Sequence, residues 1–129
     1  MILGYVIVYT KDVLHSVEFY EKAFGLKRRF VHESGQYAEM ETGATALAFV
    51  SDELATSNLS IEYRKNQLDG SPAGIEVALV SEDVDAAYKH AIANGAKSVV
   101  EPVTKPWGQV VGYVLDNNGV LIELASPMG

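Results

Sequence analysis

The alternation of apolar and polar positions predicts a strand followed by a helix in each half of the chain. Residues 2–9 are rich in β-branched and aromatic side chains, which favours a strand. In residues 12–25, apolar side chains recur at spacings of four, three and four, which places them on one face of a helix. Segments 75–81 and 83–95 repeat this order, so each half is expected to begin with a strand and an amphipathic helix.

Each predicted helix carries residues that are typical of helix ends. Asp12 and Asp83 stand at the N-cap position, where a carboxylate accepts a hydrogen bond from a free backbone N–H. Gly25 and Gly95 follow the last apolar position of each helix, and glycine is common at the C-terminal stop. The local sequence therefore predicts both ends of both helices.

Three more strands are expected after each helix, because turn residues interrupt the apolar pattern at regular intervals. Ser34-Gly35 and Thr42-Gly43 mark turns in the first half, and Asp116-Asn117-Asn118-Gly119 marks one in the second. The expected strands are residues 27–33, 36–41, 45–51, 97–101, 109–115 and 120–125.

The second half of the sequence repeats the first. Residues 8–13 align with 79–84, and residues 44–51 align with 119–126. Such a repeat indicates two copies of one supersecondary unit. We therefore predict an α+β fold of two tandem βαβββ modules, in which a curved mixed sheet surrounds an open pocket and the helices lie outside.

The two modules are expected to form a single domain, residues 1–129. Module one is assigned to 1–51 and module two to 74–129. The stretch 52–73 between them is polar and irregular, so it is interpreted as a connecting arm. Either half alone is small for a stable core, which favours one domain over two.

Composition narrows the classes of function. The net charge of −7 argues against nucleic acid as a partner, because proteins bind nucleic-acid phosphates mainly through Lys and Arg. No apolar run is long enough to span a bilayer, and no basic segment leads the chain, so we expect a cytoplasmic protein that does not enter membranes. The chain has no cysteine, which excludes disulfides, thiolate metal ligands and a cysteine nucleophile.

The repeat singles out four equivalent positions on the first and last strands of the two modules. Tyr5 and Glu76 occupy the first strands, and Ala48 and Glu123 occupy the last strands. Both glutamates have apolar neighbours in sequence, so each is either on a solvated face or buried for a purpose. A glutamate is ordinarily exposed to solvent. Two symmetry-related strand carboxylates, however, argue against simple solvent exposure of both.

Residues 11–26 and 116–124, together with the order of elements, resemble the vicinal oxygen chelate superfamily. This group contains glyoxalase I, the bleomycin-resistance proteins and the extradiol dioxygenases. The resemblance covers nearly the whole chain, and it implies paired βαβββ units curling into an eight-stranded, open pocket. It also implies a homodimer whose pocket the partner chain completes, with the segment 52–73 as a candidate for exchange between chains.

The resemblance implies a metal position that this chain fills only in part. In the metal enzymes of the superfamily, His, Gln or Glu at the four equivalent positions hold a divalent ion. Glu123 matches the last ligand and Glu76 stands where His is common, whereas Tyr5 replaces the first ligand and Ala48 offers no ligand atom. Two carboxylates without imidazole suit zinc, nickel or iron poorly, so no cofactor is expected. A divalent metal, if one binds, would be held by Glu76 and Glu123.

Three functions stay open. The first is a glyoxalase/bleomycin-resistance-type protein that binds a small molecule without a strong metal site. The second is a lyase or isomerase in which Glu76 and Glu123 share a proton and Tyr5 donates a hydrogen bond to a carbonyl oxygen. The third is a degenerate member of the superfamily that binds no ligand and is retained for protein contacts.

Further aromatic residues are candidates for ligand contact. Trp107 lies in a loop flanked by Pro and Gly, where it would either contact a ligand or pack over a sheet edge or a dimer interface. Tyr113 lies on the predicted strand 109–115 and joins Tyr5, Glu76 and Glu123 as a ligand-binding candidate. In the repeat alignment Tyr37 and Glu39 match Val110 and Gly112, which leaves their side of the sheet open.

Overall fold

The computed structural model describes residues 1–128, which form two compact units: Met1–Asn66, and a second unit that starts at Gln67. The first unit contains one four-stranded sheet and the second unit another, and neither sheet is closed. In residues 1–128 no helix is both long enough and apolar enough to cross a membrane.

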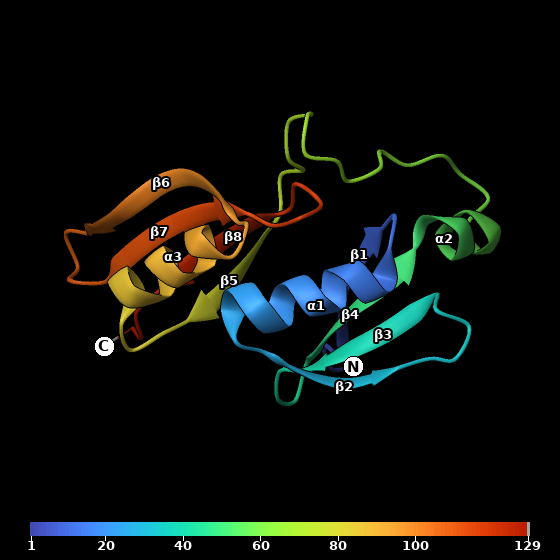
Figure 1. The fold of residues 1–129 in the computed structure, drawn as a ribbon, viewed down its shortest axis with the longest axis horizontal. Coiled ribbons are helices and arrows are strands. Elements are labelled where there is room, and N and C mark those ends of the chain that lie inside the picture. The colour runs from blue at the N-terminus through green and yellow to red at the C-terminus, as the bar shows by residue number, and fades with distance from the viewer. Residues whose placement is uncertain (129) are drawn as a thin grey trace. The chain divides into compact units, whose positions relative to one another are not determined.

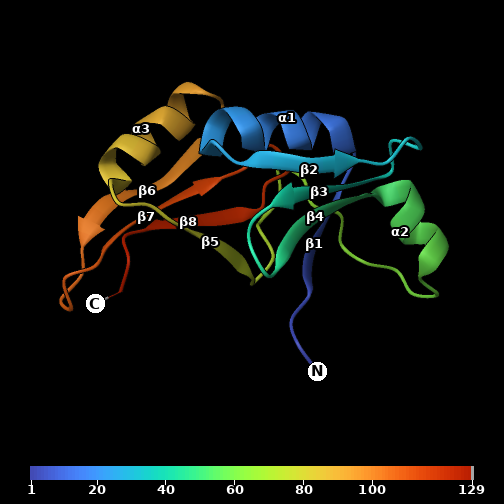
Figure 2. The ribbon, with the colours of Figure 1, turned by 90° about the horizontal axis from the view of Figure 1, so that it is seen from below.

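The first unit follows the predicted order of a strand, a helix and three strands. Its sheet order is β1-β4-β3-β2, with β1 parallel to β4 and the other neighbours antiparallel. Helix α1 lies against one side of this sheet (Figures 1 and 2). The elements are β1 (Tyr5–Thr10), α1 (Val13–Phe24), β2 (Lys27–Val31), β3 (Tyr37–Glu41), β4 (Ala46–Ser51) and α2 (Asp52–Asn58).

Both ends of α1 form as the local sequence predicts. The Asp12 carboxylate accepts a hydrogen bond of 3.0 Å from the backbone N–H of His15. Gly25 ends the helix in the left-handed conformation, with φ of 67°. Between them Tyr20 is fully buried against the sheet, and its ring lies 5.0 Å from that of Phe49 on β4. Burial of this apolar stripe holds the helix on the sheet.

The second unit repeats the same topology. Its sheet order is β5-β8-β7-β6, and β5 is parallel to β8 as β1 is to β4. Helix α3 begins at the Asp83 cap and packs on one side of the sheet over Val114 and Ile122, which are fully buried. The elements are β5 (Glu76–Val80), α3 (Val84–Ala93), β6 (Lys97–Thr104), β7 (Val110–Leu115) and β8 (Leu121–Ala125). The predicted repeat of βαβββ modules is therefore confirmed.

Three expectations about local structure were wrong. The stretch 52–73 is not irregular throughout, because Ser51 accepts a hydrogen bond from Leu54 N–H at 3.0 Å and starts helix α2. Strand β6 runs on through Pro102 rather than stopping at residue 101. An edge strand tolerates this proline: it has no backbone N–H to donate, and an edge strand pairs with a neighbour on one side alone. Strand β1 starts at Tyr5 rather than at residue 2.

Candidate functional site

Each sheet has one face toward its helix and one face without a helix, which we call the helix-free face. Successive side chains of a strand alternate between the two faces, and residues paired in register share a face. In the second sheet, Ile122 and Val114 lie in one register row beneath α3. Glu123 and its partner Tyr113 therefore point to the helix-free face.

The helix-free face of the second sheet is an apolar surface with a polar centre. Its central row across β5, β8, β7 and β6 is Ala78, Glu123, Tyr113 and Val100. The next row toward the ends of β5 and β8 is Val80, Ala125, Val111 and Val103. On the other side of the central row lie Glu76, Leu121, Leu115 and, on the edge strand, Lys97. Two carboxylates and one phenol thus lie among mostly aliphatic side chains.

Tyr113 and Glu123 form a hydrogen-bonded pair across β7 and β8. The Tyr113 hydroxyl donates to Glu123 Oε1 at 2.9 Å. This bond to the carboxylate, together with burial, raises the pKa of Tyr113 to about 12. The phenol therefore stays protonated near neutral pH, and it orients the carboxylate of Glu123.

Glu76 is the second carboxylate of this face. It is solvent-exposed, at the start of β5 in the register row next to that of Glu123. Partial burial and the charge of Glu123 raise the pKa of Glu76 above its ordinary value. Within residues 1–128, neither Glu76 nor Glu123 forms an ion pair with a basic side chain.

The other two predicted site residues do not belong to these register rows of the second sheet. Trp107 is in the turn before β7, 64% exposed, and its indole N–H donates to Gln109 Oε1 at 3.0 Å. Tyr5 begins β1 in the first unit and is 56% exposed. The structure thus brings Glu76, Tyr113 and Glu123 together, and the convergence of Tyr5 with them stays a prediction.

The equivalent face of the first sheet carries a different set of side chains. Its central row is Ile7, Ala48, Glu39 and Phe30. Since Ala48 is the counterpart of Glu123, Glu39 is the counterpart of Tyr113. The alignment of Glu39 with Gly112 is therefore off by one residue. Pairing with β4 and β8 sets this register, and the two hairpins reach it with different numbers of residues after their turn glycines.

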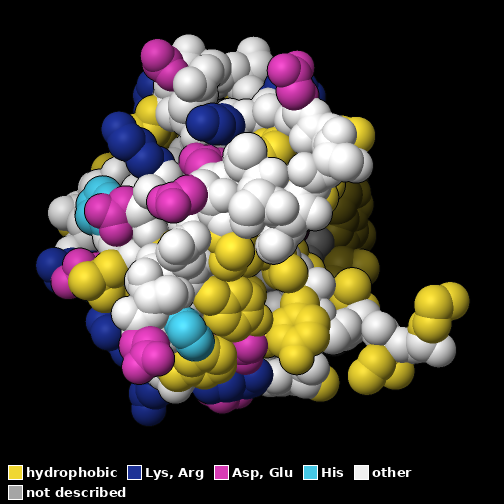
Figure 3. All heavy atoms as spheres, turned by 90° about the vertical axis from the view of Figure 1, so that its right-hand side faces the viewer, with side chains coloured by type: hydrophobic (Ala, Val, Ile, Leu, Met, Phe, Trp, Pro, Cys, Tyr) yellow, Lys and Arg dark blue, Asp and Glu magenta, His cyan; other side chains and the backbone are white. Residues whose placement is uncertain are grey.

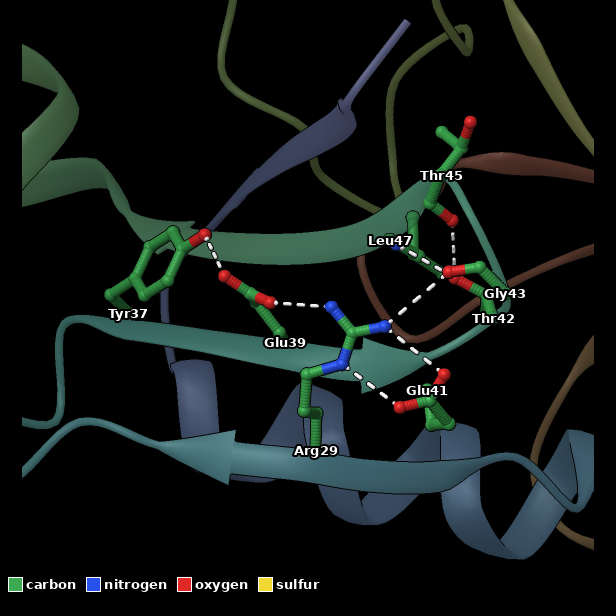
Figure 4. Close-up of polar contacts among 8 residues, drawn as sticks. All are labelled: Arg29, Tyr37, Glu39, Glu41, Thr42, Gly43, Thr45 and Leu47. Atoms are coloured by element: carbon green, nitrogen blue, oxygen red, sulfur yellow. Dashed lines mark hydrogen bonds and ion pairs between the residues drawn. The ribbon is translucent and has the colours of Figure 1, made fainter.

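Arg29 neutralises the acidic groups of the first sheet (Figure 4). Its guanidinium donates to Glu39 Oε1 at 3.0 Å and to both oxygens of Glu41, at 2.9 and 3.0 Å. Glu39 is only 8% exposed and also accepts the Tyr37 hydroxyl at 2.7 Å. Burial first, and then this bond, raise the pKa of Tyr37 to about 12. Each unit thus contains a Tyr–Glu pair, but only the first has an arginine beside it.

Sequence reasoning left the side of Tyr37 and Glu39 open and missed Arg29. A signal was present, because Tyr37, Glu39 and Glu41 alternate along one strand and must share a face. Arg29 was not identifiable in the same way. The pairing of β2 with β3 shifts register between Arg28 and Phe30, which makes the face of Arg29 depend on a bulge.

The metal position that the family resemblance implies does not have a matching set of donors. Across residues 1–128 no group of three or more His, Asp or Glu side chains could hold one ion. Ala48 is fully buried and provides no ligand atom, and the Tyr113 hydroxyl already donates to Glu123. Tight binding of a transition metal would require more donors than these positions supply.

Comparisons with known proteins identify the class. Residues 2–124 match the family described as the Glyoxalase/Bleomycin resistance protein/Dioxygenase superfamily. The chain belongs to this superfamily. Its βαβββ repeat and the sequence of residues 116–124 agree with this assignment. No functionally curated protein matches the sequence significantly.

Solved structures with low sequence identity share the fold. A glyoxalase-related enzyme from Fulvimarina pelagi superposes with a TM-score of 0.84 at 17% identity, over 98% of this chain and 88% of that one. A glyoxalase/bleomycin resistance protein/dioxygenase family enzyme from Burkholderia phytofirmans PsJN gives 0.79 at 20% identity, over 98% of both chains. TioX from Micromonospora sp. ML1 gives 0.72 at 21% identity, also over 98% of both.

Proposed function

We propose that this protein binds a small organic cation on the helix-free face of the second sheet, without strong metal chemistry. The observation that carries the proposal is the pair Glu76 and Glu123, two neighbouring carboxylates without a basic partner in an apolar surround. The first sheet is different, because there Arg29 forms ion pairs with Glu39 and Glu41.

The chemistry of this face favours a ligand with one cationic group and an apolar body. Two like charges close together raise each other's free energy, and a cation between them removes that cost. The surrounding valines and leucines would cover the apolar part of the ligand. Tyr113 keeps Glu123 oriented, so the carboxylate is in place before the ligand arrives. Binding without catalysis is also what the resemblance to the bleomycin-resistance branch implies.

The test compares benzamidine, a planar cation, with benzamide, its neutral analogue, by calorimetric titration. Benzamidine should bind more tightly, and Glu123→Gln should weaken it by about 10- to 100-fold, since a hydrogen bond to a charged group contributes roughly 1.5–3 kcal/mol. Glu82→Gln, an exposed carboxylate before α3, is the matched control and should leave both affinities unchanged. Equal affinity for both compounds, or an equal loss in the control, would refute a cation site.

A metal titration tests the second half of the proposal. Stripped protein would be titrated with nickel, zinc, manganese, iron(II) and magnesium. We expect no stoichiometric binding at micromolar affinity. Such binding, if abolished by Glu123→Gln, would make a chelating enzyme the leading function.

A second function, proton transfer beside a carbonyl group, is favoured by the raised pKa of Glu76. A glutamate whose pKa lies above the ordinary value is a stronger base once ionised. Hydroxyacetone in D₂O should then exchange its carbon-bound protons, at a rate that rises as Glu76 loses its proton. Loss of exchange in Glu76→Gln with binding retained would favour the enzyme. If the wild type does not exchange these protons, proton transfer is refuted and binding without catalysis stays as the proposed function.

A further inference from the structure

The chain contains two asparagine–glycine pairs, a dipeptide in which the asparagine readily loses its side-chain amide. They are Asn94-Gly95 and Asn118-Gly119. Glycine has no Cβ to shield its backbone nitrogen and leaves the backbone free to rotate, so this nitrogen can reach the side chain of the asparagine before it. The proposed cation site uses neither pair. Because the two dipeptides are identical, a difference in their reactivity reflects the structure around them.

The loss of the amide is an attack of the backbone on the side chain, and it needs only water. The glycine nitrogen forms a bond to the asparagine Cγ, its proton passes through water to Nδ2, and the Cγ–Nδ2 bond breaks to release ammonia. Water then opens the cyclic imide at either carbonyl carbon, which gives aspartate or isoaspartate. One water is consumed for each ammonia released, and nothing is oxidised or reduced. The glycine N–H must therefore first leave any hydrogen bond that holds it.

The turn before β8 holds Asn118-Gly119 in place. Asp116 Oδ1 accepts the backbone N–H of Asn118 and that of Val120, both at 2.8 Å, and the backbone oxygen of Asp116 accepts the Gly119 N–H at 3.2 Å. Asn118 is only 8% exposed. The backbone oxygen of Gln67 lies so close that a Cβ on Gly119 would be 2.2 Å from it. Attack at Asn118 therefore requires the turn and the segment at Gln67 to open together.

Asn94-Gly95 lies at the C-terminal end of α3 and is exposed to solvent. The Gly95 N–H donates to the backbone oxygen of Ile92 at 3.3 Å, and the Asn94 side chain donates to the backbone oxygen of His90 at 2.9 Å. Both acceptors belong to the last turn of α3. Helix ends fray at little cost in free energy, so opening of this one turn frees the attacking nitrogen and the side chain together.

We propose that Asn94 is a site of spontaneous deamidation in the folded protein, whereas the fold protects Asn118. The reaction changes the end of α3. The Ala96 N–H donates to the backbone oxygen of Ala91 at 3.0 Å, and Ala96 is buried, so the chain returns to the core directly after Gly95. A carboxylate at residue 94 meets the negative end of the helix dipole, and isoaspartate adds a methylene to the backbone just before this contact. Both products therefore weaken the attachment of α3.

The product also differs from the starting protein in charge. Deamidation adds one carboxylate to a chain whose formal net charge is −7. Asp and Glu side chains already lie among Lys and Arg on the face shown in Figure 3. The product is therefore more acidic than the starting protein, and anion exchange separates the two.

The test incubates the full chain at mildly alkaline pH and follows both sites by peptide mass spectrometry. Trypsin places the two pairs in different peptides, because Lys97 lies between them. We expect the acid to form at residue 94 faster than at residue 118 by about tenfold or more, a ratio that corresponds to roughly 1.4 kcal/mol of extra opening free energy at the turn. In urea that unfolds the chain, the two rates should become similar. Equal rates in the folded protein, a faster reaction at Asn118, or no reaction at either site before unfolding would overturn the proposal.

A variant links the reaction to the end of α3. Asn94→Gln lengthens the side chain by one methylene, which makes ring closure much slower, so the acidic species should no longer form. After incubation, the wild type should unfold at a lower urea concentration than fresh protein, and Asn94→Gln should not change. Asn58→Gln is the control, at an exposed asparagine that precedes leucine, and it should age as the wild type does. Formation of the acidic species by Asn94→Gln at the wild-type rate would show that residue 94 is not the site.

Discussion

Two tyrosine–glutamate pairs, Tyr37–Glu39 and Tyr113–Glu123, show how one kind of contact takes on different chemistry in two environments. The hydrogen bonds are similar, at 2.7 and 2.9 Å. Arg29 supplies a positive charge beside Glu39, whereas Glu76 places a second negative charge near Glu123. The first pair is therefore a neutralised part of the sheet, and the second attracts a cation.

These pairs make a pH prediction at the residue scale. The pKa of Tyr113 is about 12 in the folded protein, above the value near 10 of a free phenol. A raised pKa means that the folded state holds this proton more tightly, so the stabilisation is complete below about pH 10 and is lost as pH rises toward 12. Ultraviolet titration should show late-ionising tyrosines, and Tyr113→Phe should remove one of them. Tyr37→Phe should remove another, because the pKa of Tyr37 is also raised to about 12.

Gly119 gives a second residue-scale prediction. It has φ of 80°, and an added Cβ would lie 2.2 Å from the backbone oxygen of Gln67. Gly119→Ala should therefore lower the free energy of unfolding by about 2–4 kcal/mol, from backbone strain plus the displacement of that segment. Gly35→Ala is the matched control: φ is 72° with open space around the Cβ, so only about 1–2 kcal/mol is expected. Urea denaturation measures both, and equal losses would mean that the contact with Gln67 costs nothing.

At the scale of elements, pairing across strands decides which charges meet. Strand β2 is an edge strand with a register shift, and that shift places Arg29 opposite Glu39 and Glu41 of β3. In β6, the equivalent edge strand, no ion pair is made by the described residues. The edge strands β2 and β6 therefore give the helix-free faces of the two sheets different ion pairing.

Loss of Arg29 should be costly because it leaves a nearly buried carboxylate without its cation. Arg29→Met is expected to reduce the free energy of unfolding, because Glu39 is only 8% exposed and would lose its cation. Arg28→Met is the control within the same strand: Arg28 pairs with Glu21 at 2.9 Å, but both side chains are well exposed, so its loss should be clearly smaller. Chemical denaturation distinguishes them, and similar losses would show that Glu39 is well solvated without Arg29.

At the scale of the whole molecule, the chain consists of two units with one topology and divergent helix-free faces. We propose that it forms a homodimer, as the family resemblance implies. Sedimentation equilibrium on the full chain should then give twice the 14.0 kDa mass of one chain. A mass of one chain at micromolar concentration would contradict this.

The sequence alone determined the repeat, the capped helices, the turn glycines and the superfamily, because these depend on local periodicity and on side chains near one another along the chain. It also placed Glu76 on the first strand and Glu123 on the last strand of the second module. Only the tertiary structure decided that Tyr113 bonds to Glu123 and that Arg29 neutralises Glu39. Those contacts depend on strand register and on a bulge, and a shift of one residue turns a side chain to the other face of the sheet.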